Sequence, residues 1–166
     1  MKRIVFCSSV ALLLAGIAAI SAGAGGSYNS VTGAGWRGSP SDPTVAIRHF
    51  EVSAHDGPNG VTGQFSEDQK SFPLANFRGD VKCLVVTGNQ AIVGGVITSS
   101  DDPTNVGTGF AIGFIDNASP TPDMVTLTDT GEPPILTAAD CAAESFLFTD
   151  VPVLPFVRGN VVVHGA

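Results

Sequence analysis

The segment Val81-Lys82-Cys83-Leu84-Val85-Val86-Thr87-Gly88-Asn89-Gln90-Ala91-Ile92-Val93-Gly94-Gly95-Val96-Ile97 decides the fold class. Its two apolar runs, rich in β-branched residues, are separated by only Gly88 and Asn89. A two-residue Gly-Asn link fits the primed turns whose twist matches that of paired strands. The segment therefore predicts a β-hairpin, and Gly94-Gly95 within its second strand indicates a bulge or strong bend.

Further strands are predicted on both sides of this hairpin. Residues 45–54 alternate between two faces, and residues 61–66 follow after a Gly- and Pro-containing turn. Residues 109–116 place three large apolar side chains on one face and small residues on the other. Weaker strand candidates are residues 124–127, 145–148 and 160–164. Seven to nine short strands predict an all-β fold, either an antiparallel sandwich or a curved up-and-down barrel.

Only one short helical turn is expected, over residues 137–144. Thr137 is a good N-cap residue, and Asp140 stands three residues after it. This spacing is that of a capping box.

The N-terminus carries the three parts of a secretory signal peptide. Lys2 and Arg3 precede an apolar run over residues 4–20, and Ala22-Gly23-Ala24 follows as a cleavage site. The run is at the short end of what spans a bilayer, and no charged stop-transfer cluster follows it. We expect residues 1–24 to be a cleaved signal, residues 25–35 a flexible segment and residues 36–166 a single β-domain of a secreted protein, with no transmembrane segment after cleavage.

Cleavage makes the protein more acidic. It removes two of eight basic residues and leaves six against fifteen acidic ones, a net charge near −9. Nucleic acids require a basic surface, so a nucleic-acid partner is not expected. The same charge disfavours an anionic membrane surface.

Two cysteines, Cys83 and Cys141, remain after the signal is removed. In an exported chain such a pair most often forms a disulfide. Closing a loop of about 59 residues stabilises a fold by ~4 kcal/mol on the chain-entropy model. A thiol nucleophile with a histidine partner is the weaker alternative, because an oxidising compartment works against free thiols.

No linear catalytic motif occurs in the sequence. His49 and Glu51 share one face of a predicted strand and are the residues around which a pocket is conceivable. His55 with Asp56 lies in a turn, and His164 lies at the end of the last strand. Trp36 either closes one end of the core or offers a platform for a sugar.

Acidic loop residues raise the question of a calcium site. Asp101 with Asp102, and Asp116 with Asp123, supply oxygen atoms of the kind that Ca²⁺ prefers. No EF-hand-like loop occurs, however, and adjacent aspartates are usually solvated. We therefore expect no metal and no cofactor, and leave a weak calcium site at these two loops open.

Glycines and aromatic residues recur in a particular order along the domain. The series consists of Gly33-x-Gly35-Trp36, His49-Phe50-x-Val52-x-Ala54, Gly60-x-x-Gly63, residues 79–84, Gly88-Asn89-x-Ala91, residues 110–117 and Gly159-Asn160-x-x-x-His164. It resembles the post-COAP-1 type domain, a secreted bacterial (actinobacterial) β-domain of unknown function that also occurs as repeats in surface proteins. Ala118, where that family has glycine, and an extra loop over residues 128–143 depart from it. The resemblance implies fold and export, and supplies no catalytic residues.

We therefore expect a secreted or surface-associated, non-enzymatic β-domain that binds or adheres to an unknown extracellular or cell-surface partner, or that has a structural role. The alternative is a small secreted hydrolase, or a small-ligand carrier, with a pocket around His49 and Glu51.

Overall fold

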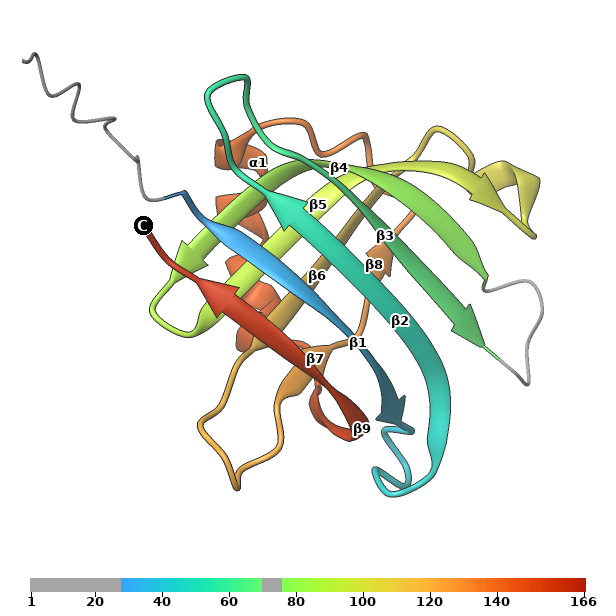
Figure 1. The fold of residues 1–166 in the computed structure, drawn as a ribbon. Coiled ribbons are helices and arrows are strands. Elements are labelled where there is room, and N and C mark those ends of the chain that lie inside the picture. Colours follow the sequence, from blue (N-terminus) through green and yellow to red (C-terminus); the bar gives the residue numbers. More distant parts are fainter. Residues whose placement is uncertain (1–27, 70–75) are drawn as a thin grey trace, which may run out of the picture.

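The computed structural model describes residues 28–69 and 76–166, which form one antiparallel sheet rolled into a barrel (Figure 1). The strands are β1 (Ser30–Gly38), β2 (Ala46–His55), β3 (Thr62–Gln69), β4 (Phe77–Thr87), β5 (Gln90–Ser100), β6 (Gly109–Ile115), β7 (Met124–Thr126), β8 (Asp129–Thr130) and β9 (Val153–His164). Among the described residues, three short helices connect them: the 3-10 helices η2 (Pro103–Asn105) and η3 (Glu144–Phe148), and α1 (Ala138–Ala143).

The sheet closes because β9 pairs with both ends of the strand order. Each strand from β1 to β7 pairs with the next along the chain, and β9 then lies between β7 and β1. The two-residue β8 pairs with β6 as an extra strand outside this ring of eight. The prediction of an all-β fold with seven to nine strands is confirmed, and of its two forms the up-and-down barrel is the one observed.

The hairpin predicted around Gly88 and Asn89 is confirmed as β4 and β5. Thr87 pairs with Gln90, and Gly88 has a φ of 61°, as the tight turn requires. The predicted irregularity is present too, but its extra residue is Lys82 on β4, opposite Gly94 and Gly95. Glycine is needed at position 95 because a Cβ there would lie 2.0 Å from the carbonyl oxygen of Asp80.

Two expectations about the outer parts of the domain were wrong. The strand predicted at residues 145–148 is the helix η3, because this segment packs its Leu147 side chain onto the outside of the barrel. The domain was expected to start at residue 36, whereas β1 starts at Ser30 and pairs with β2 and β9 along its length. The capping box of Thr137 and Asp140 is confirmed at the start of α1. The predicted signal lies outside the described residues.

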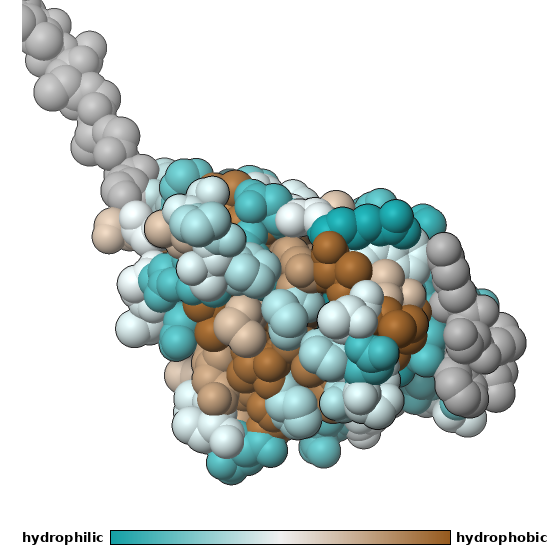
Figure 2. Space-filling view, turned by 90° about the horizontal axis from the view of Figure 1, so that it is seen from below, coloured by the Kyte–Doolittle hydropathy of each residue, from teal (hydrophilic) through white to brown (hydrophobic). Residues whose placement is uncertain are grey.

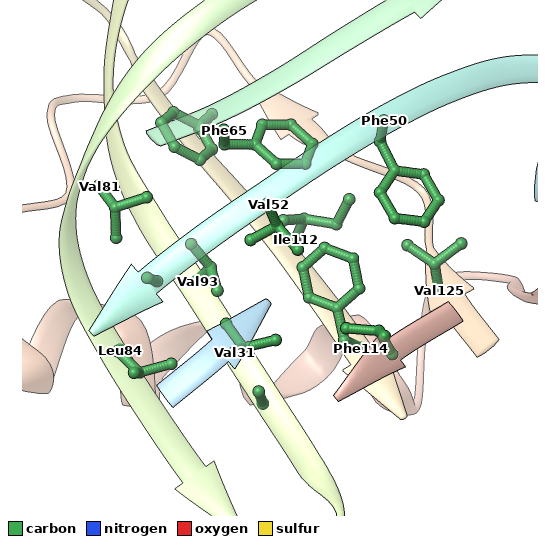
Figure 3. Packing of buried hydrophobic residues seen from close by; sticks show 14 of the residues in the cluster. Val31, Phe50, Val52, Phe65, Val81, Leu84, Val93, Ile112, Phe114 and Val125 are labelled. Atoms are coloured by element: carbon green, nitrogen blue, oxygen red, sulfur yellow. The ribbon is translucent and has the colours of Figure 1, made fainter. Parts of the chain in front are cut away.

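Aromatic side chains fill the barrel interior. Six buried phenylalanines form a continuous series of ring contacts with centroids 4.8–6.5 Å apart, in the order Phe156, Phe50, Phe114, Phe65, Phe110 and Phe77. Buried valines and isoleucines pack around them (Figure 3). An eight-stranded barrel has an interior that side chains of this size can fill.

A separate segment, residues 131–152, covers the outer face of β4–β6; we call it the strap (Figure 1). The disulfide between Cys83 on β4 and Cys141 on α1, with Cα atoms 6.1 Å apart, ties the strap to the barrel and confirms the predicted pair. Ile135 and Leu147 of the strap are buried beside this bridge. The strap includes most of the extra loop that was noted in the sequence at residues 128–143.

Glycines make room for the strap on the barrel surface. A Cβ at position 94 would lie 2.7 Å from Cγ2 of Ile135, and one at position 109 would lie 2.3 Å from the carbonyl oxygen of Pro133. A Cβ on Gly113 would lie 2.7 Å from the ring of Phe148. The small residues on this face of β5 and β6 therefore allow a close approach of a second layer.

Carboxylates complete the seam of the barrel next to the start of β7. β7 and β9 pair over only three residues, and further along β9 the backbone N–H groups of Val161 and Val163 donate to side chains. Val161 N donates to Oδ2 of Asp123 and Val163 N to Oδ2 of Asp116, each at 2.9 Å. Oδ1 of Asp123, which is buried, also accepts from Asn117 N at 2.8 Å.

We expect Asp123→Ala to lower the free energy of unfolding by about 2–4 kcal/mol, because two backbone N–H groups lose a charged acceptor. Urea denaturation measures the loss. The matched control is Asp150→Ala, an exposed strap residue whose carboxylate has no hydrogen bond to another described residue; it should change stability by less than ~0.5 kcal/mol. Equal stability of the two variants would show that the seam does not depend on Asp123.

Replacing both cysteines, Cys83→Ala with Cys141→Ala, should cost about 4 kcal/mol on the chain-entropy model. We also expect residues 131–152 to exchange their amide hydrogens faster while the strands of the barrel stay protected. Urea denaturation with hydrogen exchange tests both. Uniform loss of protection across β1–β9 would contradict a strap that is separate from the barrel core.

Candidate binding site

A hollow lies on the outside of the sheet, across β1–β5, and we call it the outer groove. It has a volume of about 510 Å³. Its lining residues are Gly33, Ala34, Glu51, Val52, Ser53, Gln64, Phe65, Ser66, Arg78, Gly79, Thr98 and Ser99. The size is within the range of small-molecule sites, although this lining is more polar than is usual for them.

Two opposite charges stand in the groove on alternate strands. Glu51 on β2 is paired in register with Ser66 on β3, and Ser66 with Arg78 on β4. Two strand spacings separate Glu51 from Arg78, about 10 Å between backbones. Both side chains are exposed, and neither makes an ion pair or hydrogen bond with another described residue. The groove therefore presents a carboxylate and a guanidinium that do not neutralise each other.

Polar side chains line the groove around these two charges. Gln64, Ser66 and Ser99 make no side-chain hydrogen bond to another described residue. Thr98 donates its hydroxyl to the carbonyl oxygen of Arg78 at 3.3 Å and keeps its acceptor capacity. The walls thus offer several donors and acceptors at once.

His49 does not line the groove, although it shares a strand with Glu51. Its ring packs against Trp36 on β1, with centroids 5.1 Å apart, and the guanidinium of Arg158 on β9 lies 4.9 Å from the Trp36 ring. Neighbours from the two adjacent strands therefore flank Trp36, and a sugar would have to displace one of them to stack there. His49 and Glu51 make no hydrogen bond to each other.

A second histidine, His55, forms the one histidine–serine hydrogen bond among the described residues. His55 Nε2 lies 3.3 Å from Oγ of Ser53, and both side chains are exposed. A catalytic serine-histidine pair needs a third group that orients the ring. No carboxylate, Asp56 included, hydrogen-bonds the ring of His55 among the described residues. His164 is exposed at the end of β9.

The carboxylates considered for calcium have protein donors in the structure. Asp101 accepts from the side-chain amide of Asn76 at 2.9 Å. Asp102 accepts from the hydroxyl and the backbone N–H of Thr104, and these two hydrogen bonds lower its pKa. Asp116 and Asp123 accept from the barrel backbone, as described above. No group of three or more His, Cys, Asp or Glu side chains that could hold a metal ion occurs in residues 28–69 and 76–166.

A buried ionic cluster, which the sequence did not reveal, lies inside one end of the barrel. Glu67 on β3 accepts from Arg37 on β1 at 3.1 Å, and it also contacts Arg48 on β2 and the hydroxyl of Thr128. Glu67 and Arg37 are almost completely buried. Burial lowers the pKa of Arg37, and the Glu67 carboxylate opposes this effect. The two arginines share the one carboxylate of Glu67, and the cluster lies outside the outer groove.

Apolar side chains are also exposed in places. On the face seen from below, hydrophobic residues gather across the middle of a largely polar surface (Figure 2). On the strap, Leu136 and Phe146 are exposed, and Phe148 lines a small cleft of about 270 Å³ beside Val85 and Ile92. Glu144 of the strap has its pKa raised by burial, with Asp129 and Glu132 adding to the effect.

Comparison of the chain with protein-family models, with curated proteins and with solved structures finds no match. Within the described part of the chain, no helix is both long enough and apolar enough to cross a membrane.

We expect Glu67→Gln to lower the free energy of unfolding by about 3–5 kcal/mol, because it leaves two arginines, one of them buried, without their counter-charge. Urea denaturation measures this, with Glu51→Gln, an exposed and unpaired glutamate, as the matched control. Replacing Arg37, Arg48 and Glu67 together by methionine should cost less than Glu67→Gln alone, since no unpaired charge then remains. A triple variant less stable than Glu67→Gln would contradict this account of the cluster.

Proposed function

We propose that this protein is a secreted or surface-associated, non-enzymatic binding module that contacts its extracellular partner through the outer groove. The observation that carries the proposal is the contrast between the two sides of the sheet. The inside is filled by phenylalanine rings, whereas the outside has a hollow of about 510 Å³ whose polar side chains are mostly without a partner among the described residues.

The filled interior speaks against the carrier alternative. A barrel that carries a small ligand leaves space for it inside, as larger or emptier barrels do. Here ring contacts continue from Phe156 near one end of β9 to Phe77 at the start of β4.

The composition of the groove speaks against the hydrolase alternative. Glu51 is the one carboxylate among the described residues that line it, whereas most glycosidases need a pair of carboxylates on either side of the bond to be cleaved. His49 is held against Trp36 and does not line the groove.

Secretion rests on the N-terminal sequence, and the Cys83–Cys141 bridge agrees with an oxidising compartment. The resemblance to secreted surface domains points the same way. An acidic net charge of −7 for the whole chain disfavours nucleic acid as the partner.

Sedimentation with insoluble envelope material from the producing cells tests the proposal. We expect the exported protein to sediment with this material and Ser66→Arg to lose most of the binding, because the arginine side chain occupies the middle of the groove. Thr130→Arg on β8, also an exposed strand position but outside the groove, should bind as wild type does.

Two results would contradict the proposal. One is a Ser66→Arg variant that sediments as well as wild type. The other is turnover of esters, glycosides or peptides by the purified protein that disappears in Glu51→Gln or His49→Asn.

A further inference from the structure

The ligand class of the outer groove follows from the polar groups that the groove exposes to solvent. Gln64, Ser66 and Ser99 have side-chain donors and acceptors without a partner among the described residues. A hydroxyl or amide side chain both donates and accepts hydrogen bonds, as a sugar hydroxyl does. Walls of this kind match a polyhydroxylated ligand in many orientations.

The floor of the groove has little side-chain bulk. Gly33, Ala34 and Gly79 contribute backbone or a single methyl group, so a ligand can approach the sheet closely. At Gly79 a Cβ would meet the buried Phe110 ring at 2.4 Å, so a side chain there would point into the core, and Gly79 lines the groove with its backbone alone.

The two charged side chains, Arg78 and Glu51, determine how a ligand is oriented in the groove. The exposed guanidinium of Arg78 can bind a carboxylate through two parallel hydrogen bonds. Glu51, about 10 Å away across Ser66, can accept hydrogen bonds from sugar hydroxyls but would repel a second carboxylate. A ligand with one carboxylate at one end and hydroxyls at the other fits this arrangement, whereas a polyanion does not.

An extended peptide fits the groove less well. Strand addition needs a free sheet edge, but in the groove β2 is paired on both sides, with β1 and β3, and β3 is paired with β2 and β4. The walls are hydroxyls, an amide and two charges rather than apolar pockets for alternate side chains.

We propose that the outer groove binds an oligosaccharide that carries an isolated carboxylate, with Arg78 on the carboxylate and Glu51 on hydroxyl groups. This inference rests on the proposed function, since it names the ligand class of the same groove. None of the described residues that line the groove offers an exposed aromatic ring for stacking, so the affinity of one site is expected to be weak.

Titration with defined sugars tests the ligand class. The probes are 3′-sialyllactose, which has one carboxylate, lactose, which is its neutral core, and tetragalacturonate, a polyanion; the shifts of backbone amide NMR signals report binding. We expect 3′-sialyllactose to bind about tenfold more tightly than lactose, as one charge-assisted contact supplies. Tetragalacturonate should bind no better than lactose.

Variants connect the affinity to the two charges. Arg78→Gln should reduce 3′-sialyllactose binding about tenfold, to the level of lactose, and Glu51→Gln should weaken both sugars alike. Lys82→Gln, on the same strand as Arg78 but outside the groove, is the matched control and should bind as wild type does. All three substitutions are at exposed positions, and unchanged amide spectra without ligand verify that they fold.

The outcomes separate this inference from the proposed function. Equal binding of 3′-sialyllactose and lactose, no binding of either, or an unchanged affinity in Arg78→Gln overturns the ligand class. If Ser66→Arg still abolishes binding to envelope material, the groove remains the binding site for a different ligand. If Ser66→Arg leaves envelope binding intact, the proposed function falls as well.

Discussion

The series of phenylalanine rings inside the barrel is the constraint on which the rest of the molecule depends. Each of the six rings contacts at least one other, with the nearest pair, Phe50 and Phe156, at 4.8 Å. Aromatic pairs at such distances stabilise a core beyond the apolar area that they bury. The rings come from β2, β3, β4, β6 and β9, so the core forms only when distant strands have paired and the barrel has closed. Because the interior is filled, our proposed function places the partner on the outer surface.

The outer surface is divided into two regions with different roles. Over β4–β6, glycines and Ala111 accept the strap, and the disulfide and Leu147 lie in a second, smaller core. Over β1–β5, short polar side chains and two separated charges leave a groove open. The alternation of strand residues places the apolar set inside and these polar groups outside. Closure of the barrel therefore creates the core and the groove together.

Local patterns predicted the parts of the fold that depend on local physics. The hairpin at Gly88-Asn89, the phenylalanine face of β6 and the capping box of α1 are each visible within about ten residues, and the disulfide follows from a count of two cysteines. The start of β1 was missed because Gly33 and Gly35 look like a loop, and only pairing with β2 and β9 makes them strand. The segment 145–148 was taken for a strand because of its apolar residues. In the structure these residues cover the barrel from outside and do not join the sheet.

The candidate site was predicted only in part, because its residues come from separate strands. Glu51 was singled out, but for a pocket with His49; the structure places it across Ser66 from Arg78 instead. Nothing linear marks Arg78, or the Arg37–Glu67–Arg48 cluster, whose members meet only through the register of three strands.

The measurement that tests the central claim most directly is an NMR titration with 3′-sialyllactose that follows ring and backbone signals together. The account predicts shifts at the amides of Glu51, Ser66 and Arg78 with the six interior phenylalanine rings unchanged; shifts of those rings, with the groove amides unmoved, would contradict it.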